Sequence, residues 1–99
     1  MPVYLVARGR IADREMHDEY VDRAVPTLPA DARVVSFDLA SDVVEGDAAD
    51  DRTVIIEFPS RESFRAWYDS PEYQEVLPLR LNSVPGSLAV VDGYVADEG

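Results

Sequence analysis

The sequence predicts a single α+β domain, built in the order strand–helix–strand–strand–helix–strand, with one sheet and one helical layer. Three observations predict it: short apolar runs rich in β-branched residues, two regions with apolar residues at helical spacing, and turn residues between them. The runs typical of strands are Val3–Arg8, Arg33–Leu39, Thr53–Phe58 and Leu88–Val95. The length of 99 residues corresponds to one domain. We place it at residues 1–96, with 97–99 as a frayed tail.

The first helix is predicted from Asp13 to about Val25. Asp13 is a suitable N-cap, and Pro26 and Pro29 end the helix. Apolar or aromatic side chains recur on one face, which we expect to be buried. These side chains are Met16, His17, Tyr20, Val21, Ala24 and Leu28.

The second helical region is predicted to be broken into two pieces. Ser60 caps the first piece, and the segment Asp69–Glu72 ends it and starts the next, with Ser70 as cap and Pro71 in the first helical position. Pro78 is expected to limit the second piece. The acidic stretch Ser41–Arg52 is expected to form a turn, with a short extended piece at Val43-Val44.

The element order predicts the ferredoxin-like sandwich, with a four-stranded antiparallel sheet. Right-handed crossovers place the strands Val3–Arg8 and Thr53–Phe58 side by side at its centre, and we expect these two to run parallel to each other. Both helical regions then cover one face of the sheet. The other face needs a cover, so we expect a homodimer in which two such faces meet as a dimeric α/β barrel.

Charge and composition disfavour several partners. The net charge of −11 disfavours nucleic acid and anionic membrane surfaces, and all nine positive side chains are arginines. The absence of cysteine excludes disulfides and thiolate chemistry. No secretory signal or apolar span is visible, so we expect a cytoplasmic protein. No phosphate-binding loop or dinucleotide fingerprint indicates a nucleotide cofactor, no ligand set indicates a metal, and we therefore expect no cofactor.

Several strings of residues resemble a known family. The segment Val54-Ile55-Ile56-Glu57-Phe58-Pro59-Ser60, then Ala66-Trp67-Tyr68-Asp69-Ser70-Pro71-Glu72-Tyr73, and then Leu79-Arg80 resemble the small bacterial family called domain of unknown function 1330. Tyr4-Leu5-Val6, Asp13 and Tyr20 fit the same pattern, so the resemblance covers nearly the whole chain. It implies a dimeric α/β barrel with a cavity between helices and sheet or inside the barrel, and it implies no reaction. The chain departs from the family in Leu28–Ala32, where members often carry a glycine pair.

His17, the only histidine, lies three residues before Tyr20, so the two share a helical face. A catalytic interpretation makes His17 a general base held by the Tyr20 hydroxyl. The interpretation that we favour is a packed aromatic substitute, partly exposed at the edge of the helix.

Arg8 and Glu57 are predicted to meet on the uncovered face of the sheet. Strand alternation places Arg8 with Tyr4 and Val6, and Glu57 with Thr53 and Ile55. Such a pair could bind a polar group of a ligand. A structural salt bridge in the dimer is the interpretation that we favour.

The aromatic residues Trp67, Tyr68 and Tyr73 surround the break between the helical pieces. They could frame a pocket, although for Trp67 core packing is favoured. Arg80 could bind an anionic ligand or the last carbonyls of its helix, and the two readings are equally supported. The acidic loop lacks the spacing of a calcium site and is interpreted as solvated.

Two functions remain open from sequence. The first is binding or cofactor-independent conversion of a small molecule in a barrel cavity, with His17 and Tyr20 as catalytic candidates and Arg8, Glu57, Tyr68 and Arg80 as ligand-binding candidates. The second is a non-catalytic structural domain, in which these residues only support the dimer. The discriminating observation is a pocket lined by the candidate residues.

Overall fold

The sheet of this computed structural model, which describes residues 1–95, has four strands in the order β2-β3-β1-β4. The strands are β1 (Val3–Gly9), β2 (Arg33–Asp38), β3 (Arg52–Phe58) and β4 (Gly86–Asp92). All three neighbouring pairs are antiparallel. The predicted antiparallel sheet is confirmed, and the parallel pairing of β1 with β3 is wrong. The crossover makes β1 parallel to β2, and β3 lies between them, antiparallel to both.

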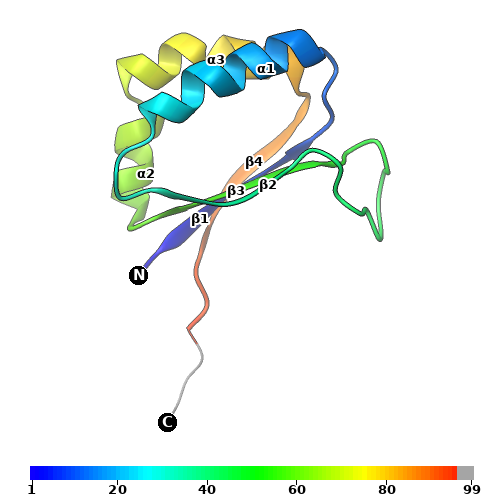
Figure 1. Cartoon of the computed structure of the whole chain (residues 1–99). Helices are drawn as coiled ribbons and strands as arrows, with labels where there is room; N and C mark the ends of the chain where they lie inside the picture. Colours follow the sequence, from blue (N-terminus) through cyan, green and yellow to red (C-terminus); the bar gives the residue numbers. More distant parts are fainter. Residues whose placement is uncertain (96–99) are drawn as a thin grey trace.

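The helices lie on one side of the sheet (Figure 1). They are α1 (Arg14–Ala24), the short 3-10 helix η1 (Val25–Thr27), α2 (Arg61–Tyr68) and α3 (Pro71–Ser83). The predicted caps are confirmed, since the side chains of Asp13, Ser60 and Ser70 each accept a hydrogen bond from a backbone N–H of the first turn.

Helix α3 continues past Pro78, so the predicted end at this residue is wrong. A proline inside a helix removes one hydrogen bond, in this case the bond to the carbonyl of Gln74. Both Pro78 and Gln74 are exposed, so water can satisfy that carbonyl. The extra turns place Arg80 on the same helix as Tyr73, two turns further on.

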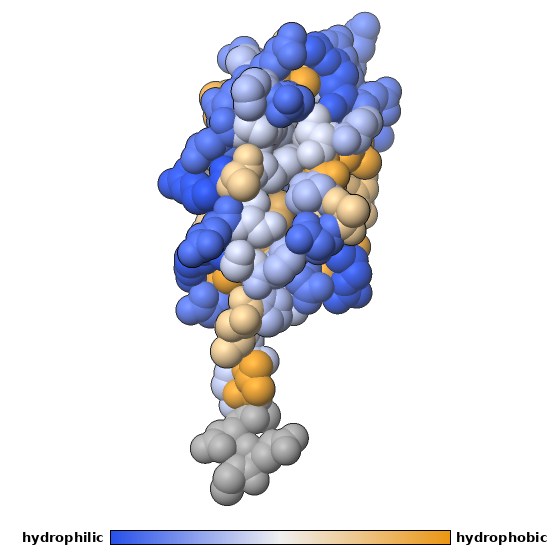
Figure 2. Space-filling model, turned by 90° about the vertical axis from the view of Figure 1, so that its left-hand side faces the viewer, coloured by the Kyte–Doolittle hydropathy of each residue, from blue (hydrophilic) through white to orange (hydrophobic). Residues whose placement is uncertain are grey.

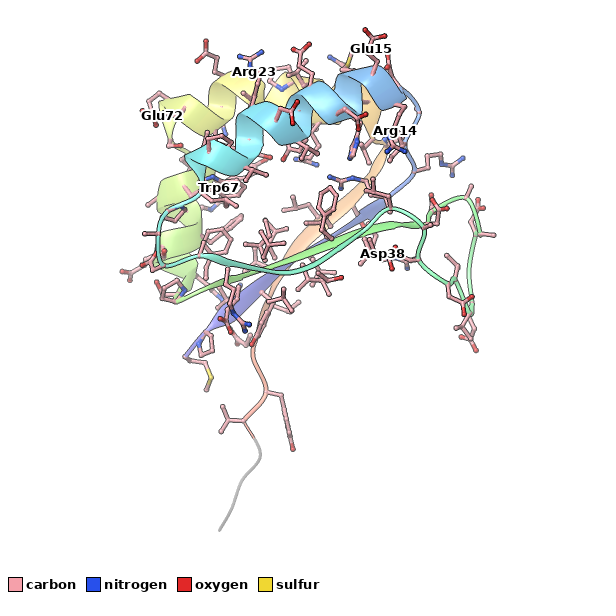
Figure 3. The ribbon with its side chains drawn as sticks, viewed as in Figure 1. Arg14, Glu15, Arg23, Asp38, Trp67 and Glu72 are labelled. Carbon is pink, nitrogen blue, oxygen red and sulfur yellow. The ribbon has the colours of Figure 1, made fainter. Side chains whose placement is uncertain are left out.

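The core lies between the helical layer and the inner face of the sheet. Alternate residues of β1 and β3 are buried there, as strand alternation predicts. Trp67 packs against Phe58 and Tyr73, with ring centroids 5.5 and 4.1 Å apart. The predicted packing role of Trp67, which is 6% exposed, agrees with these contacts. Glu15, Arg23 and Glu72 lie on the outer side of the helical layer (Figure 3).

Two smaller expectations differ from the structure. Strand β4 ends at Asp92, so Gly93–Val95 extend beyond the sheet. Val43-Val44 form no strand, because the loop from Leu39 to Asp51 is held instead by turns and by arginine contacts. In this loop Asp47 and Asp50 each form an ion pair with Arg10. The predicted tail, residues 97–99, lies outside the described residues, as does Ala96.

The other face of the sheet carries no helix (Figure 1). Tyr4, Val6 and Arg8 of β1 point to it, as do Thr53, Ile55 and Glu57 of β3, opposite the buried residues of each strand. We call these six residues the open face. The side of the molecule that carries α2 is mostly hydrophilic, with small separate hydrophobic spots (Figure 2).

Candidate functional site

A cavity of about 60 Å³ lies between α1 and the inner face of the sheet. We call it the α1 cleft. Its walls are mainly apolar, and four polar side chains line it as well: Tyr20, Arg52, Tyr73 and Arg80. The apolar lining is Leu5, Ala7, Val21, Ala24, Val25, Leu28, Val34, Phe37, Val54, Ile56, Trp67 and Leu88.

The α1 cleft reaches the surface along the edge of the sheet formed by β2. Val34 and Phe37 lie opposite the inward-facing Ile56 and Val54 in the strand register, so they point to the helical side. They are nevertheless 44% and 46% exposed. Val25 of η1 also lines the cleft and is 51% exposed. These half-exposed side chains form the mouth of the cleft.

His17 and Arg52 form a buried polar pair beside the cleft. The Nε of Arg52 donates to Nε2 of His17 over 2.8 Å. A guanidinium N–H is always a donor, so Nε2 of His17 carries no proton and Nδ1 does. Nδ1 lies 3.1 Å from a carboxylate oxygen of Asp18. Burial is the main cause that lowers the pKa of His17 below its ordinary value of 6.5. The imidazole is therefore neutral near neutral pH.

This arrangement overturns two expectations about His17. The ring is fully buried, at 0% exposure, and not partly exposed at the helix edge. It is held by Arg52 and Asp18 and not by the Tyr20 hydroxyl. Both ring nitrogens are engaged, so neither is available to take a proton from a ligand. The geometry gives His17 the role of positioning Arg52, which does not fit the catalytic interpretation as a general base.

Tyr20, Tyr73 and Arg80 form a second polar chain at the cleft. The two tyrosine hydroxyl oxygens are 2.9 Å apart, and the Nε of Arg80 donates to the hydroxyl oxygen of Tyr73 over 3.3 Å. Burial raises the pKa of Tyr20, so its hydroxyl stays protonated. Arg80 thus faces the cleft, and no hydrogen bond among residues 1–95 takes it to the helix carbonyls.

The ligand-binding candidates Arg8 and Glu57 do not meet. Both lie on the open face, as predicted, but the antiparallel register pairs Arg8 with Thr53 and Glu57 with Tyr4. Glu57 accepts from the Tyr4 hydroxyl over 2.9 Å and from Arg33 over 3.3 Å. The hydrogen bond from Tyr4 is the main cause that lowers the pKa of Glu57. Arg8 donates instead to the carbonyl of Asp50 over 3.0 Å.

Tyr68 also lies away from the α1 cleft. Its ring stacks near Phe64, with centroids 5.5 Å apart, and the guanidinium of Arg65 lies 5.7 Å from its centroid. These residues line a groove between α2 and strand β4, together with Leu88 and Val90. Of the predicted site residues, the structure therefore brings together His17, Tyr20 and Arg80 only.

Sequence reasoning missed Arg52 and gave Tyr73 no specific role. Arg52 was assigned to the acidic loop because β3 was expected to begin one residue later. Strand alternation contained the signal, since Arg52 precedes the inward-facing Val54 and Ile56 by two and four residues. The sequence indicates Tyr73 only as an aromatic residue that could frame a pocket, and the partner of its hydroxyl, Tyr20, lies on α1, far away in sequence.

The whole fold matches one family and several solved structures. The family described as "Domain of unknown function (DUF1330)" matches residues 2–94. A protein of unknown function from Rhodopseudomonas palustris has a TM-score of 0.80 at 18% identity, covering 96% of this chain and 84% of that chain. No curated protein matches the sequence.

Two further structures extend the comparison. SnoaB, a cofactor-independent oxygenase from Streptomyces nogalater, has a TM-score of 0.66 at 11% identity, covering 99% of this chain and 98% of that chain. A dimeric ferredoxin-like protein of unknown function from Thermobifida fusca has a TM-score of 0.60 at 15% identity, covering 92% and 88% of the two chains. These likenesses confirm the ferredoxin-like fold.

The described part of the chain has neither a membrane-spanning helix nor a cluster of metal ligands. No helix within it is long and apolar enough to cross a membrane. Residues 1–95 contain no group of three or more histidine or acidic side chains placed to hold a metal ion.

Proposed function

The chain belongs to the DUF1330 family, and we propose that it binds a small, largely apolar molecule in the α1 cleft. The observation that carries the proposal is the combination of an apolar cavity with polar groups that converge at one place. Ligand sites in proteins have this composition, since apolar walls supply binding energy and a few polar groups fix orientation. Tyr20, Arg52, Tyr73 and Arg80 are the groups that would orient the ligand. No nucleotide cofactor is part of the proposal.

The alternative, a purely structural domain, is less well supported by the cleft. A structural core is expected to be packed to the density of an organic crystal. Here a cavity of about 60 Å³ is retained, which exceeds the space that one water molecule needs. A structural core would also pair its buried charges. Arg52, which is 3% exposed, has only a neutral histidine as hydrogen-bond partner among the described residues.

The test uses a panel of small aromatic and aliphatic compounds, both charged and neutral. Compounds that bind only the folded protein raise its melting temperature. Fluorescence offers a second measure, because Trp67 is the only tryptophan and lines the cleft. We expect at least one compound to raise the melting temperature and to change the emission of Trp67.

A matched pair of variants locates the binding. Val25→Trp places a large ring at the mouth of the cleft, whereas Val44→Trp makes the same change in the loop between β2 and β3, at a residue that is 87% exposed. Both variants add a second tryptophan, so binding is followed by the melting temperature, and we expect Val25→Trp to abolish binding and Val44→Trp to preserve it. A panel without any binder, or binders that Val25→Trp leaves unaffected, would contradict the proposal.

We also propose that the open face packs against the same face of a second copy. Ile55 and Val6 lie on this face, and the extended segment after β4 leaves the body on the side opposite to the helices (Figure 1). In that segment Tyr94 is 91% and Val95 67% exposed, which is unfavourable for a monomer in water. The Thermobifida fusca protein of similar fold is described as dimeric, which supports a dimer of this chain. Light scattering at micromolar concentration should give the mass of a dimer, and a stable monomer would refute it.

A further inference from the structure

Positive charge is concentrated in the α1 cleft, although the protein as a whole is strongly acidic. The chain carries a net charge of −11, yet both charged side chains that line the cleft are arginines, Arg52 and Arg80. Ion pairs engage most of the other arginines, but none of the ion pairs among residues 1–95 includes these two. Two like charges that line one small cavity repel each other, and burial strengthens the repulsion.

The cleft also has more hydrogen-bond donors than acceptors. Each guanidinium uses its Nε on a neutral group, His17 for Arg52 and Tyr73 for Arg80. The terminal nitrogens of both have no hydrogen-bond acceptor within the described residues. The two tyrosine hydroxyls share one hydrogen bond, so one of their two hydrogens has no acceptor there either. A ligand that supplies only acceptors would satisfy these donors.

The geometry points to a carboxylate as the ligand group: we propose that the α1 cleft binds a small carboxylic acid, with its carboxylate on Arg52 and Arg80 and its apolar part along α1. This inference rests on the proposed function and names its ligand class. A planar carboxylate accepts two parallel hydrogen bonds from a guanidinium, and such charge-assisted bonds are stronger than neutral ones. Neutralising one charge also relieves the repulsion between the arginines.

Other anions fit this cleft less well. A phosphate group is larger, carries more charge and needs donors on several sides. Beyond the four polar side chains, however, the remaining walls are hydrocarbon, and the cavity measures only about 60 Å³. An apolar body suits those walls, so the favoured ligand has one carboxylate at one end and hydrocarbon at the other. Inorganic phosphate is therefore a suitable negative control.

The test compares benzoate with benzamide, its neutral counterpart of the same shape. Binding is followed by the emission of Trp67 and by the melting temperature of the full chain. We expect benzoate to bind at least about tenfold more tightly than benzamide, as a charge-assisted bond implies. Inorganic phosphate at the same concentration should not compete. Equal affinity for benzoate and benzamide would overturn the carboxylate proposal.

A variant then assigns the contact. Arg80→Met keeps a long apolar stem and removes the charge. We expect this variant to bind benzoate at least about tenfold more weakly than the wild type, and to bind benzamide with an affinity unchanged within about twofold. Arg65→Met is the control, because Arg65 lies on the outside of α2 with a side chain that is 65% exposed. Unchanged benzoate binding by Arg80→Met would also overturn the proposal.

Stability provides an independent measurement. Because Arg80 adds to an unrelieved pair of like charges, we expect Arg80→Met to melt at or above the wild-type temperature in the absence of ligand. A structural role for Arg80 would instead lower the melting temperature. The failure of this proposal is distinct from the failure of the proposed function. If Val25→Trp abolishes the binding of neutral compounds, but carboxylates bind no more tightly than their neutral counterparts, the cleft is a binding site and only the proposed ligand class is wrong.

Discussion

The Nε of Arg52 lies 2.8 Å from Nε2 of His17, and this contact joins strand β3 to helix α1 in the interior of the protein. It fixes the tautomer of His17 and the orientation of a guanidinium that is 3% exposed. Arg52 is thereby directed at the α1 cleft while its charge has no carboxylate beside it among residues 1–95. The pair has a structural and a functional consequence, and each can be measured.

Replacing His17 by Phe should lower the free energy of unfolding by about 1–3 kcal/mol. The phenyl ring fills a similar space, but it leaves the Nε of a buried arginine without an acceptor. His17→Gln is the control, because the side-chain oxygen of glutamine can accept a hydrogen bond from Arg52. The free energy of unfolding should therefore fall less in this variant than in His17→Phe. Denaturant melts of the two variants measure this difference. Equal stability of His17→Phe and the wild type would mean that only the packing of the ring matters.

The stability of the protein should fall as the pH is lowered below about 6.5. The folded-state pKa of His17 is lowered, mainly by burial, so in this range the unfolded chain binds a proton that the folded chain does not. Stability is fully present above the unfolded pKa and is lost between that value and the lower folded one. His17 is the only histidine, so His17→Gln should flatten the profile between about pH 7 and 5.5. A variant with the wild-type slope would refute this assignment.

Thr27→Val should lower the free energy of unfolding by about 1–2 kcal/mol. The Thr27 hydroxyl donates to the carbonyl of Ala24 over 2.6 Å and accepts from Nε1 of Trp67 over 2.9 Å. Valine has the same shape and makes neither bond, so η1 loses its hydrogen bond to Trp67 of α2. Thr27→Ser keeps both bonds and serves as the control. Equal melting temperatures of Thr27→Val and Thr27→Ser would contradict this account.

Ile55→Asp should convert the proposed dimer into a monomer. The substitution places a charge at the centre of the open face, where partner contact would bury it without a counter-charge. Val44→Asp makes the same change at an exposed loop position and should leave the mass unchanged. Light scattering reports the mass, and circular dichroism checks that the fold is retained. A dimer that persists in Ile55→Asp would place the interface elsewhere.

Much of the fold followed from local signals in the chain. Asp13, Ser60 and Ser70 each cap a helix because a short polar side chain satisfies nearby backbone donors, a requirement visible in sequence. The prediction that the helix ends at Pro78 is wrong, and for a physical reason. Proline weakens a helix locally, but packing of Tyr73 and Val76 in the core and exposure of the broken hydrogen bond let α3 continue.

The sequence by itself determined the element order, the caps, the two faces of the central strands and the family, because these depend on neighbours within a few residues or on whole strings of residues. Only the tertiary structure decided which polar groups meet. The antiparallel register separated Arg8 from Glu57, and the crossing of α1 over the sheet brought His17 to Arg52, 35 positions apart. The contact between Tyr20 and Tyr73 spans 53 positions. No local sequence pattern encodes contacts between residues so far apart in the chain, since these contacts follow from how the helical layer packs on the sheet.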